Sequence, residues 1–109
     1  MPETDATNEV FRALADASRR QLLDSLRSDD GQTLNQLCEG LAMSRQAVSK
    51  HLAILAAAGL VVTEQKGRNK HHYLNPVPLI EMVDRWVDPY RQRQADALVR
   101  LRNELENKL

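Results

Sequence analysis

The chain has 109 residues, of which 42% are hydrophobic and 28% charged, and its 15 basic residues balance 15 acidic ones. This length is that of one small domain and excludes a two-domain enzyme, while the composition is that of a folded globular protein. The single cysteine, Cys38, excludes an intramolecular disulfide and cannot by itself make a structural zinc site.

Two short helices are predicted at the start of the chain. Val10, Phe11 and Leu14 have the spacing of one helical face. Asp16 follows as an N-cap for a second amphipathic stretch, and residues 29–31 have the composition of a turn. The first thirty or so residues therefore predict a pair of helices that ends at a turn.

The next two predicted helices have the layout of a helix-turn-helix. Thr33 and Gln36 match a capping box at the start of the third helix, which ends near Gly40. Ser44 caps the fourth helix, which runs up to Gly59. Its inner face is predicted to carry Val48, Leu52 and Leu55, and the opposite face is polar and basic. A short turn between two such helices is typical of this motif.

A β-hairpin is predicted directly after the fourth helix. Residues 60–65 and 71–74 have the composition of two strands, and turn formers lie between them. A hairpin in this position is the wing of a winged helix-turn-helix. Its tip would carry Lys66, Arg68 and Lys70, which suits contact with phosphates or a narrow minor groove. A hairpin that is merely made soluble by its charges is the alternative.

Apolar residues recur at helical spacing in the last part of the chain. Pro89 interrupts this pattern, either as the start of a new helix or within a single one. A domain this small cannot wholly cover such an arm with its own core, whereas the same helix of a second copy can cover it in a two-fold dimer. We therefore assign to a dimer interface Phe11, Trp86, Tyr90, Leu98, Leu101 and Leu105.

Basic residues concentrate in the middle of the sequence. Residues 44–72 hold five Lys and Arg against one Asp or Glu, whereas residues 1–43 hold four against eight and residues 73–109 hold six against six. All three histidines also fall in the middle part. This segregation is typical of a surface that binds polyanions, although a solvated basic face would look similar.

With these elements in order, the sequence resembles the ArsR/SmtB family of bacterial winged-helix repressors over about residues 8–75. The likeness is strongest at residues 11–20 and 43–52, which look like the family's opening and its recognition helix. It implies a mainly α fold with a small β-hairpin, a winged helix-turn-helix with the order α-α-α-α-β-β-α. We expect a single domain over residues 1–109, with a DNA-binding core at 8–75 and a C-terminal helical dimerisation arm at 76–109.

The resemblance also implies a homodimeric repressor that binds double-stranded DNA at a palindromic operator. Arg45 and Gln46, in the first turn of the fourth helix, are expected to contact base edges. Phosphates are expected to be held by Ser44, Ser49, Lys50 and Arg68.

The metal ligands of the family's metal sensors are missing here. Those members carry a Cys-x-Cys pair or a close relative of it on the third helix, where this chain has only Cys38, and others use Asp and His pairs on the last helix, where residues 76–109 contain no histidine. Cys38 lies on the stripe of Leu34 and Leu41, so we expect a small buried hydrophobe. No metal or cofactor is predicted.

The histidines have structural interpretations as well. His51 lies one helical step from apolar positions, which favours a packed, hydrogen-bonded side chain over a ligand. His71 and His72 are adjacent on a strand and point to opposite faces, so they cannot easily share a metal ion. Cys38 paired with His51 would need a third, orienting group that the sequence does not show, and no enzyme is predicted.

Two alternatives remain beside a simple repressor. One is a redox- or metal-responsive sensor that uses Cys38, and the other is a protein-interaction module that has lost DNA binding. No apolar run approaches the roughly 18 residues of a membrane span, and the sequence MPETD at the start lacks the features of a signal peptide. We therefore expect a cytoplasmic protein with no membrane contact, and the sequence leaves any small-molecule effector open.

Overall fold

The computed structural model describes residues 2–108, with side chains from residue 6 onwards. The chain separates into two compact units, the first ending at Leu79 and the second beginning at Ile80. Their elements run in the order α1 (Pro2–Leu14), α2 (Ala17–Ser28), β1 (Gln32–Thr33), α3 (Leu34–Gly40), α4 (Arg45–Ala57), β2 (Val61–Lys66), β3 (Asn69–Leu74) and α5 (Val77–Lys108).

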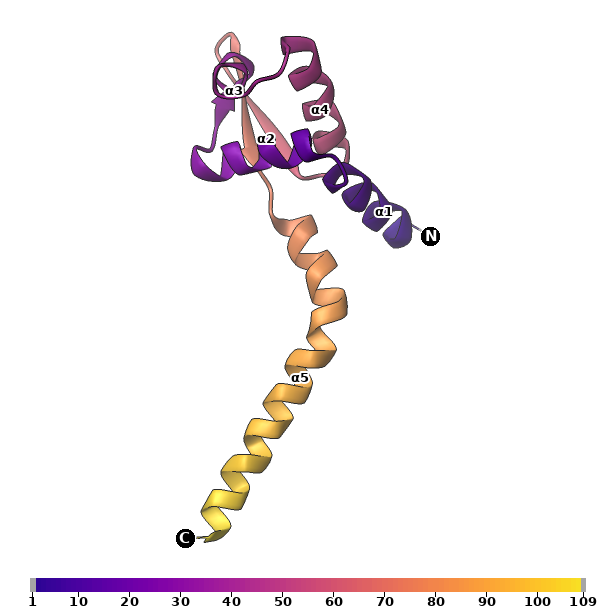
Figure 1. Cartoon of the computed structure of the whole chain (residues 1–109), viewed down its shortest axis with the longest axis vertical. Coiled ribbons are helices and arrows are strands. Elements are labelled where there is room, and N and C mark those ends of the chain that lie inside the picture. The colour runs from indigo at the N-terminus through magenta and orange to yellow at the C-terminus, as the bar shows by residue number, and fades with distance from the viewer. Residues whose placement is uncertain (1, 109) are drawn as a thin grey trace. The chain divides into compact units, whose positions relative to one another are not determined.

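The first unit is built around α2, which contacts α3, α4 and β3 (Figure 1). Its core consists of aliphatic side chains that recur at helical spacing, and burying each one stabilises the fold by roughly 1.5–3 kcal/mol. The largest fully buried side chains are Leu22, Leu26, Leu37, Val48, Leu55 and Leu60. The predicted inner faces of the second and fourth helices are therefore confirmed.

The predicted four helices followed by a hairpin are confirmed, and the structure adds one short strand. β1, β3 and β2 form an antiparallel sheet in which β3 is central. β1 pairs with β3 through Gln32 opposite His72 and Thr33 opposite His71. A strand of two residues is too short to show an alternating pattern, so the sequence does not predict it.

The three predicted N-caps are confirmed. The Asp16 carboxylate accepts a hydrogen bond of 3.1 Å from the backbone N–H of Arg19 at the start of α2. Thr33 and Gln36 form the reciprocal capping box of α3. The Ser44 hydroxyl accepts 3.1 Å from the backbone N–H of residue 47, and this bond fixes the first turn of α4.

Asp16 should make folding stability depend on pH. The backbone N–H of Arg19 is the main cause that holds the pKa of Asp16 below its ordinary value. The ionised cap therefore stabilises the fold above that ordinary value, and its contribution is lost as pH falls through the lowered pKa. We expect the melting temperature of Asp16→Ala to lie below wild type at neutral pH and to approach it in acid.

Asp16→Asn is the matched control, because asparagine also caps helices but does not titrate. Its melting temperature should lie close to wild type at neutral pH. Thermal unfolding of the three proteins between pH 7 and about pH 3 measures the effect. A constant difference between wild type and Asp16→Ala over this range would contradict the assignment.

The second unit consists of most of α5, which is a single helix of 32 residues with Pro89 inside it. This resolves the sequence alternatives in favour of one uninterrupted helix. A proline removes one backbone hydrogen bond from a helix interior. Arg91 bridges this position, because its Nη1 lies 2.5 Å from Asp84 Oδ1 and 3.1 Å from Asp88 Oδ1.

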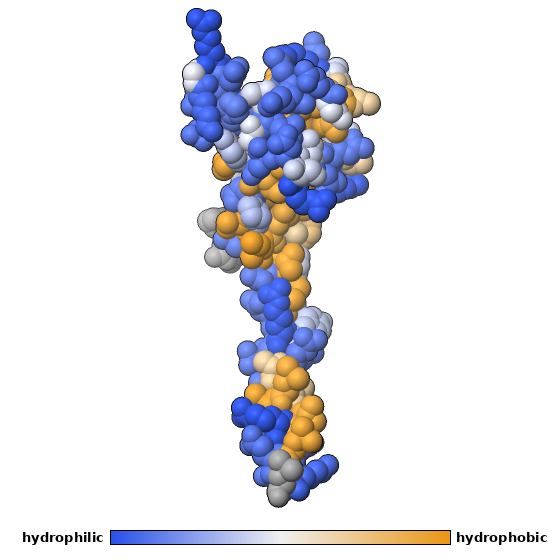
Figure 2. Space-filling model, turned by 90° about the vertical axis from the view of Figure 1, so that its left-hand side faces the viewer, coloured by the Kyte–Doolittle hydropathy of each residue, from blue (hydrophilic) through white to orange (hydrophobic). Residues whose placement is uncertain are grey.

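No described residue of α5 is buried. Figure 2 shows hydrophobic side chains gathered at two levels of α5, with hydrophilic ones between them. The exposed large hydrophobic residues on this helix are Val77, Ile80, Val83, Trp86, Tyr90, Leu98, Val99, Leu101 and Leu105. None of the helices in residues 2–108 combines the length and hydrophobicity that a membrane span requires.

Candidate nucleic-acid interface

The helix-turn-helix consists of α3, the residues after Gly40, and α4. Val48, Leu52 and Leu55 turn one side of α4 into the core, since they lie four and three residues apart. The opposite side is solvent-exposed and contains four side chains predicted to contact DNA, namely Arg45, Gln46, Ser49 and Lys50. Burial of one face therefore fixes which side chains of α4 can reach a partner.

A groove of about 440 Å³ lies between α3, α4 and the hairpin. Its cationic side chains are Arg45, Arg68 and Lys70, and none of its lining residues is acidic. Such a surface attracts a polyanion. The groove is lined by Thr33, Leu34, Asn35, Arg45, Ser49, Leu52, Ala53, Ala56, Thr63, Arg68, Asn69, Lys70 and His72.

The structure thus brings together half of the residues predicted to bind DNA. Arg45 and Ser49 from α4 share the groove with Arg68 and Lys70 from the hairpin. The other three on or before α4, which are Ser44, Gln46 and Lys50, are exposed but do not line it. The hydroxyl of Ser44 is used as the N-cap of α4.

The hairpin turn is narrower than its composition predicts. β2 and β3 pair as far as Lys66 and Asn69, so the turn consists only of Gly67 and Arg68. Gly67 has a φ of +62°, a left-handed conformation that favours glycine. Of the three basic residues predicted at the tip, Arg68 lies in the turn itself, Lys66 ends β2 directly before the turn, and Lys70 is the second residue of β3.

The side chain of Lys66 contacts other residues of the hairpin. Its Nζ donates a hydrogen bond of 2.9 Å to the hydroxyl of Tyr73 and lies 4.0 Å from Oε2 of Glu64. The bond to Tyr73 is the main cause of the raised pKa of Lys66. Lys66 does not line the groove, unlike the other two basic residues of the hairpin.

Sequence reasoning missed several residues that line the groove. Thr33 and Asn35 come from the start of α3, and Thr63, Asn69 and His72 come from the two long strands. The two asparagines and two threonines carry no charge, so the concentration of basic residues in the sequence does not indicate them. Asn35 also accepts a hydrogen bond from Nη1 of Arg45.

All three histidines make hydrogen bonds within the protein. Nη1 of Arg19 lies 3.4 Å from Nδ1 of His51, which confirms the packed interpretation of this half-buried residue. His71 donates from Nδ1 to the carbonyl of Gly31 at 2.7 Å, and His72 donates to the carbonyl of Gln32 at 2.9 Å. His72 is buried, with 7% of its surface exposed.

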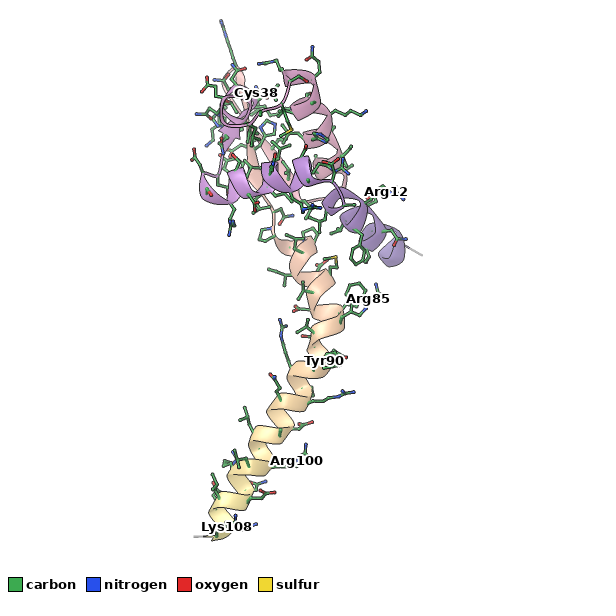
Figure 3. All side chains as sticks on the ribbon, in the orientation of Figure 1. Arg12, Cys38, Arg85, Tyr90, Arg100 and Lys108 are labelled. Carbon is green, nitrogen blue, oxygen red and sulfur yellow. The ribbon has the colours of Figure 1, made fainter. Side chains whose placement is uncertain are left out.

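Cys38 lies on α3 and is only half-buried (Figure 3). The prediction of a buried side chain therefore does not hold for Cys38, because the neighbouring Leu37 occupies the core position of this helix. Among the side chains described, those of residues 6–108, no group of three or more His, Cys, Asp or Glu could hold a metal ion.

Comparison with known proteins identifies the fold. A helix-turn-helix domain family matches residues 14–64. The chain is 35% identical over 85 residues to the uncharacterized HTH-type transcriptional regulator YuzN of Bacillus subtilis, covering 72% of this chain and 92% of that protein. It is 32% identical over 77 residues to the transcriptional repressor SdpR of Bacillus subtilis, covering 71% and 84%.

A solved structure extends the likeness to nearly the whole chain. The ArsR-like transcriptional regulator from Rhodococcus sp. RHA1 superimposes with a TM-score of 0.73 at 28% identity, covering 94% of this chain and 95% of that one. The resemblance seen in the recognition helix and wing is thus found in sequence relatives and in a solved structure alike. The chain belongs to the ArsR/SmtB family of winged helix-turn-helix, DNA-binding transcriptional regulators.

Proposed function

We propose that the protein is a homodimeric repressor that binds a palindromic site in double-stranded DNA through α4 and the hairpin. The observation that carries this proposal is the groove beside α4, which has three cationic side chains and no acidic one. The relative SdpR is named a transcriptional repressor, which supports repression of transcription as the role of this protein.

In this proposal α4 enters the major groove with its N-terminus first. Arg45 and Gln46 meet base edges, because they occupy the first turn of the helix and are exposed. Ser49, Lys50 and Arg68 hold phosphates, and the exposed backbone N–H groups at the start of α4 attract another. Two copies bind half-sites about 10 base pairs apart.

The dimer is proposed to form through α5. Phe11 of the first unit is 43% exposed, and on the second unit exposed apolar residues of α5 lie between Trp86, which is 51% exposed, and Leu105. A two-fold axis places the same patch on both partners, so one apolar face can cover the other. The proposed interface consists of Phe11, Trp86, Tyr90, Leu98, Leu101 and Leu105, as the sequence indicates.

The proposal includes no catalytic role and places the protein in the cytoplasm with the DNA it binds. The relatives YuzN and SdpR are named as transcriptional regulators. Nδ1 of His51 pairs with the guanidinium of Arg19. This nitrogen is therefore poorly placed to act as a base for Cys38.

Arg68→Ala tests the contact of the hairpin with DNA. Arg68 lies in the turn and lines the groove, so it should contact a phosphate or the minor groove and carry little base information. We expect affinity to fall alike for all sequences, and the slope of log K against log salt to fall by about one unit. Fluorescence anisotropy with duplex DNA at several salt concentrations measures both.

Arg27→Ala is the matched control, since it removes the same charge at the end of α2. Arg27 is 73% exposed, lies 3.9 Å from Asp24 and does not line the groove. Its salt slope should equal that of wild type. An Arg68→Ala slope unchanged from wild type would remove the hairpin from the proposed interface.

A further inference from the structure

A hydrogen bond joins the two helices of the helix-turn-helix at the edge of the groove. Nη1 of Arg45, the first residue of α4, donates to Oδ1 of Asn35 in the first turn of α3. Both side chains are exposed and line the groove. The bond therefore acts on a side chain that the proposed function assigns to base recognition.

This bond restricts an arginine that would otherwise be free to move. An exposed arginine loses side-chain entropy when it is fixed in one conformation. A partner that already restrains the guanidinium in the free protein reduces the part of this cost that falls on DNA binding.

The geometry of the bond also determines which donors remain. A guanidinium carries five N–H groups in a planar fork. With Nη1 held by Asn35, the edge formed by Nε and Nη2 has no hydrogen-bond partner among the described residues, and two parallel donors of this kind match O6 and N7 of guanine.

The acceptor is a neutral amide, which has a second consequence. A carboxylate at position 35 would form an ion pair that cancels the charge of Arg45 and competes with the DNA. Asparagine orients the guanidinium and leaves its positive charge available. No acidic residue lines the groove, so the charge of Arg45 is not neutralised from another side.

We propose that Asn35 is a positioning residue for Arg45, which it orients so that Nε and Nη2 contact a guanine in each half-site. The proposal rests on the proposed function and names one base that the protein recognises. Asn35 acts through Arg45 and does not itself specify the base.

The test begins with sites selected from a random duplex library by the wild-type full chain. Affinity is then measured for the selected site and for every single-base variant of it. The proteins compared are wild type, Asn35→Ala, Asn35→Asp, Arg45→Ala and the double variant Asn35→Ala with Arg45→Ala. Glu39→Ala is the control on α3, because this exposed residue does not line the groove.

Arg45→Ala should abolish the preference for guanine at one position of the half-site. Asn35→Ala should lower the preference at that same position by about 2- to 10-fold and leave the other positions unchanged, because it removes one hydrogen bond that orients the guanidinium. The double variant should match Arg45→Ala alone. Asn35→Asp should weaken binding to every sequence.

Two results would contradict the role of Asn35 without contradicting the proposed function. One is an Asn35→Ala protein with wild-type preference at every position, and the other is an effect that adds to that of Arg45→Ala. Wild-type protein that selects no sequence at all would instead contradict the proposed function. Equal melting temperatures of wild type and Asn35→Ala separate loss of positioning from loss of folding.

Discussion

Replacing Leu98 and Leu101 together by alanine is expected to leave the protein monomeric at micromolar concentration. The two side chains are 66% and 51% exposed on α5, where the proposed dimer buries them. Loss of a buried leucine side chain costs about 2–5 kcal/mol, and in a symmetric dimer each substitution acts twice. The loss is therefore large compared with the stability of a typical interface.

Operator affinity should fall together with dimerisation. One winged helix alone keeps half of the DNA contacts and loses the advantage of linked half-sites, which is worth about 100-fold or more. Sedimentation at several protein concentrations measures the association, and binding to the selected duplex measures the consequence.

Arg100→Ala with Asn103→Ala is the control for this experiment. At about 3.6 residues per turn, both of these exposed residues lie on the side of α5 away from Leu98 and Leu101, and alanine favours the helical conformation (Figure 3 labels Arg100). This variant should remain dimeric. A Leu98→Ala, Leu101→Ala protein that associates as tightly as wild type would contradict the proposed interface.

Leu55→Ala should strongly destabilise the first unit. Leu55 has no exposed surface and lies on the inner side of α4. The substitution should lower the free energy of unfolding by about 2–5 kcal/mol, against a total of about 5–15 kcal/mol for a small domain. DNA binding should weaken once a substantial fraction of the protein unfolds, since α4 carries the recognition surface.

Unfolding in urea measures this difference. Val62→Ala is the matched control, because this aliphatic residue of β2 is 48% exposed and should change stability little. Leu55→Ala with the midpoint and slope of wild type would show that α4 is not anchored through this position.

Short-range patterns predicted the elements that position the interface. Asp16, Thr33 and Ser44 are recognisable as caps from the residues that follow them, because a cap and its partner lie three residues apart. The inner face of α4 was equally readable from its spacing. The sequence alone therefore predicts the helix-turn-helix and the hairpin.

The errors arise where partners are distant in the sequence or where a turn tightens. β1 exists because Gln32 and Thr33 pair with residues some forty positions later. The turn composition at 66–70 is compatible with a wide loop, and only the strand register shows that Lys66 belongs to the hairpin stem. Asn35 gained its role from a contact with Arg45 that no local pattern encodes.

The short strand β1 restrains the hairpin by pairing with β3. Gly31 donates its N–H to the carbonyl of His72 at 2.9 Å, and the imidazoles of His71 and His72 return bonds to the carbonyls of Gly31 and Gln32. β3 therefore has hydrogen-bonded neighbours on both edges: β2 on one side, and on the other the segment that leads into α3. The hairpin and α3 are therefore connected through the same sheet. The wing is already ordered in the free protein, so DNA binding requires little further ordering of it.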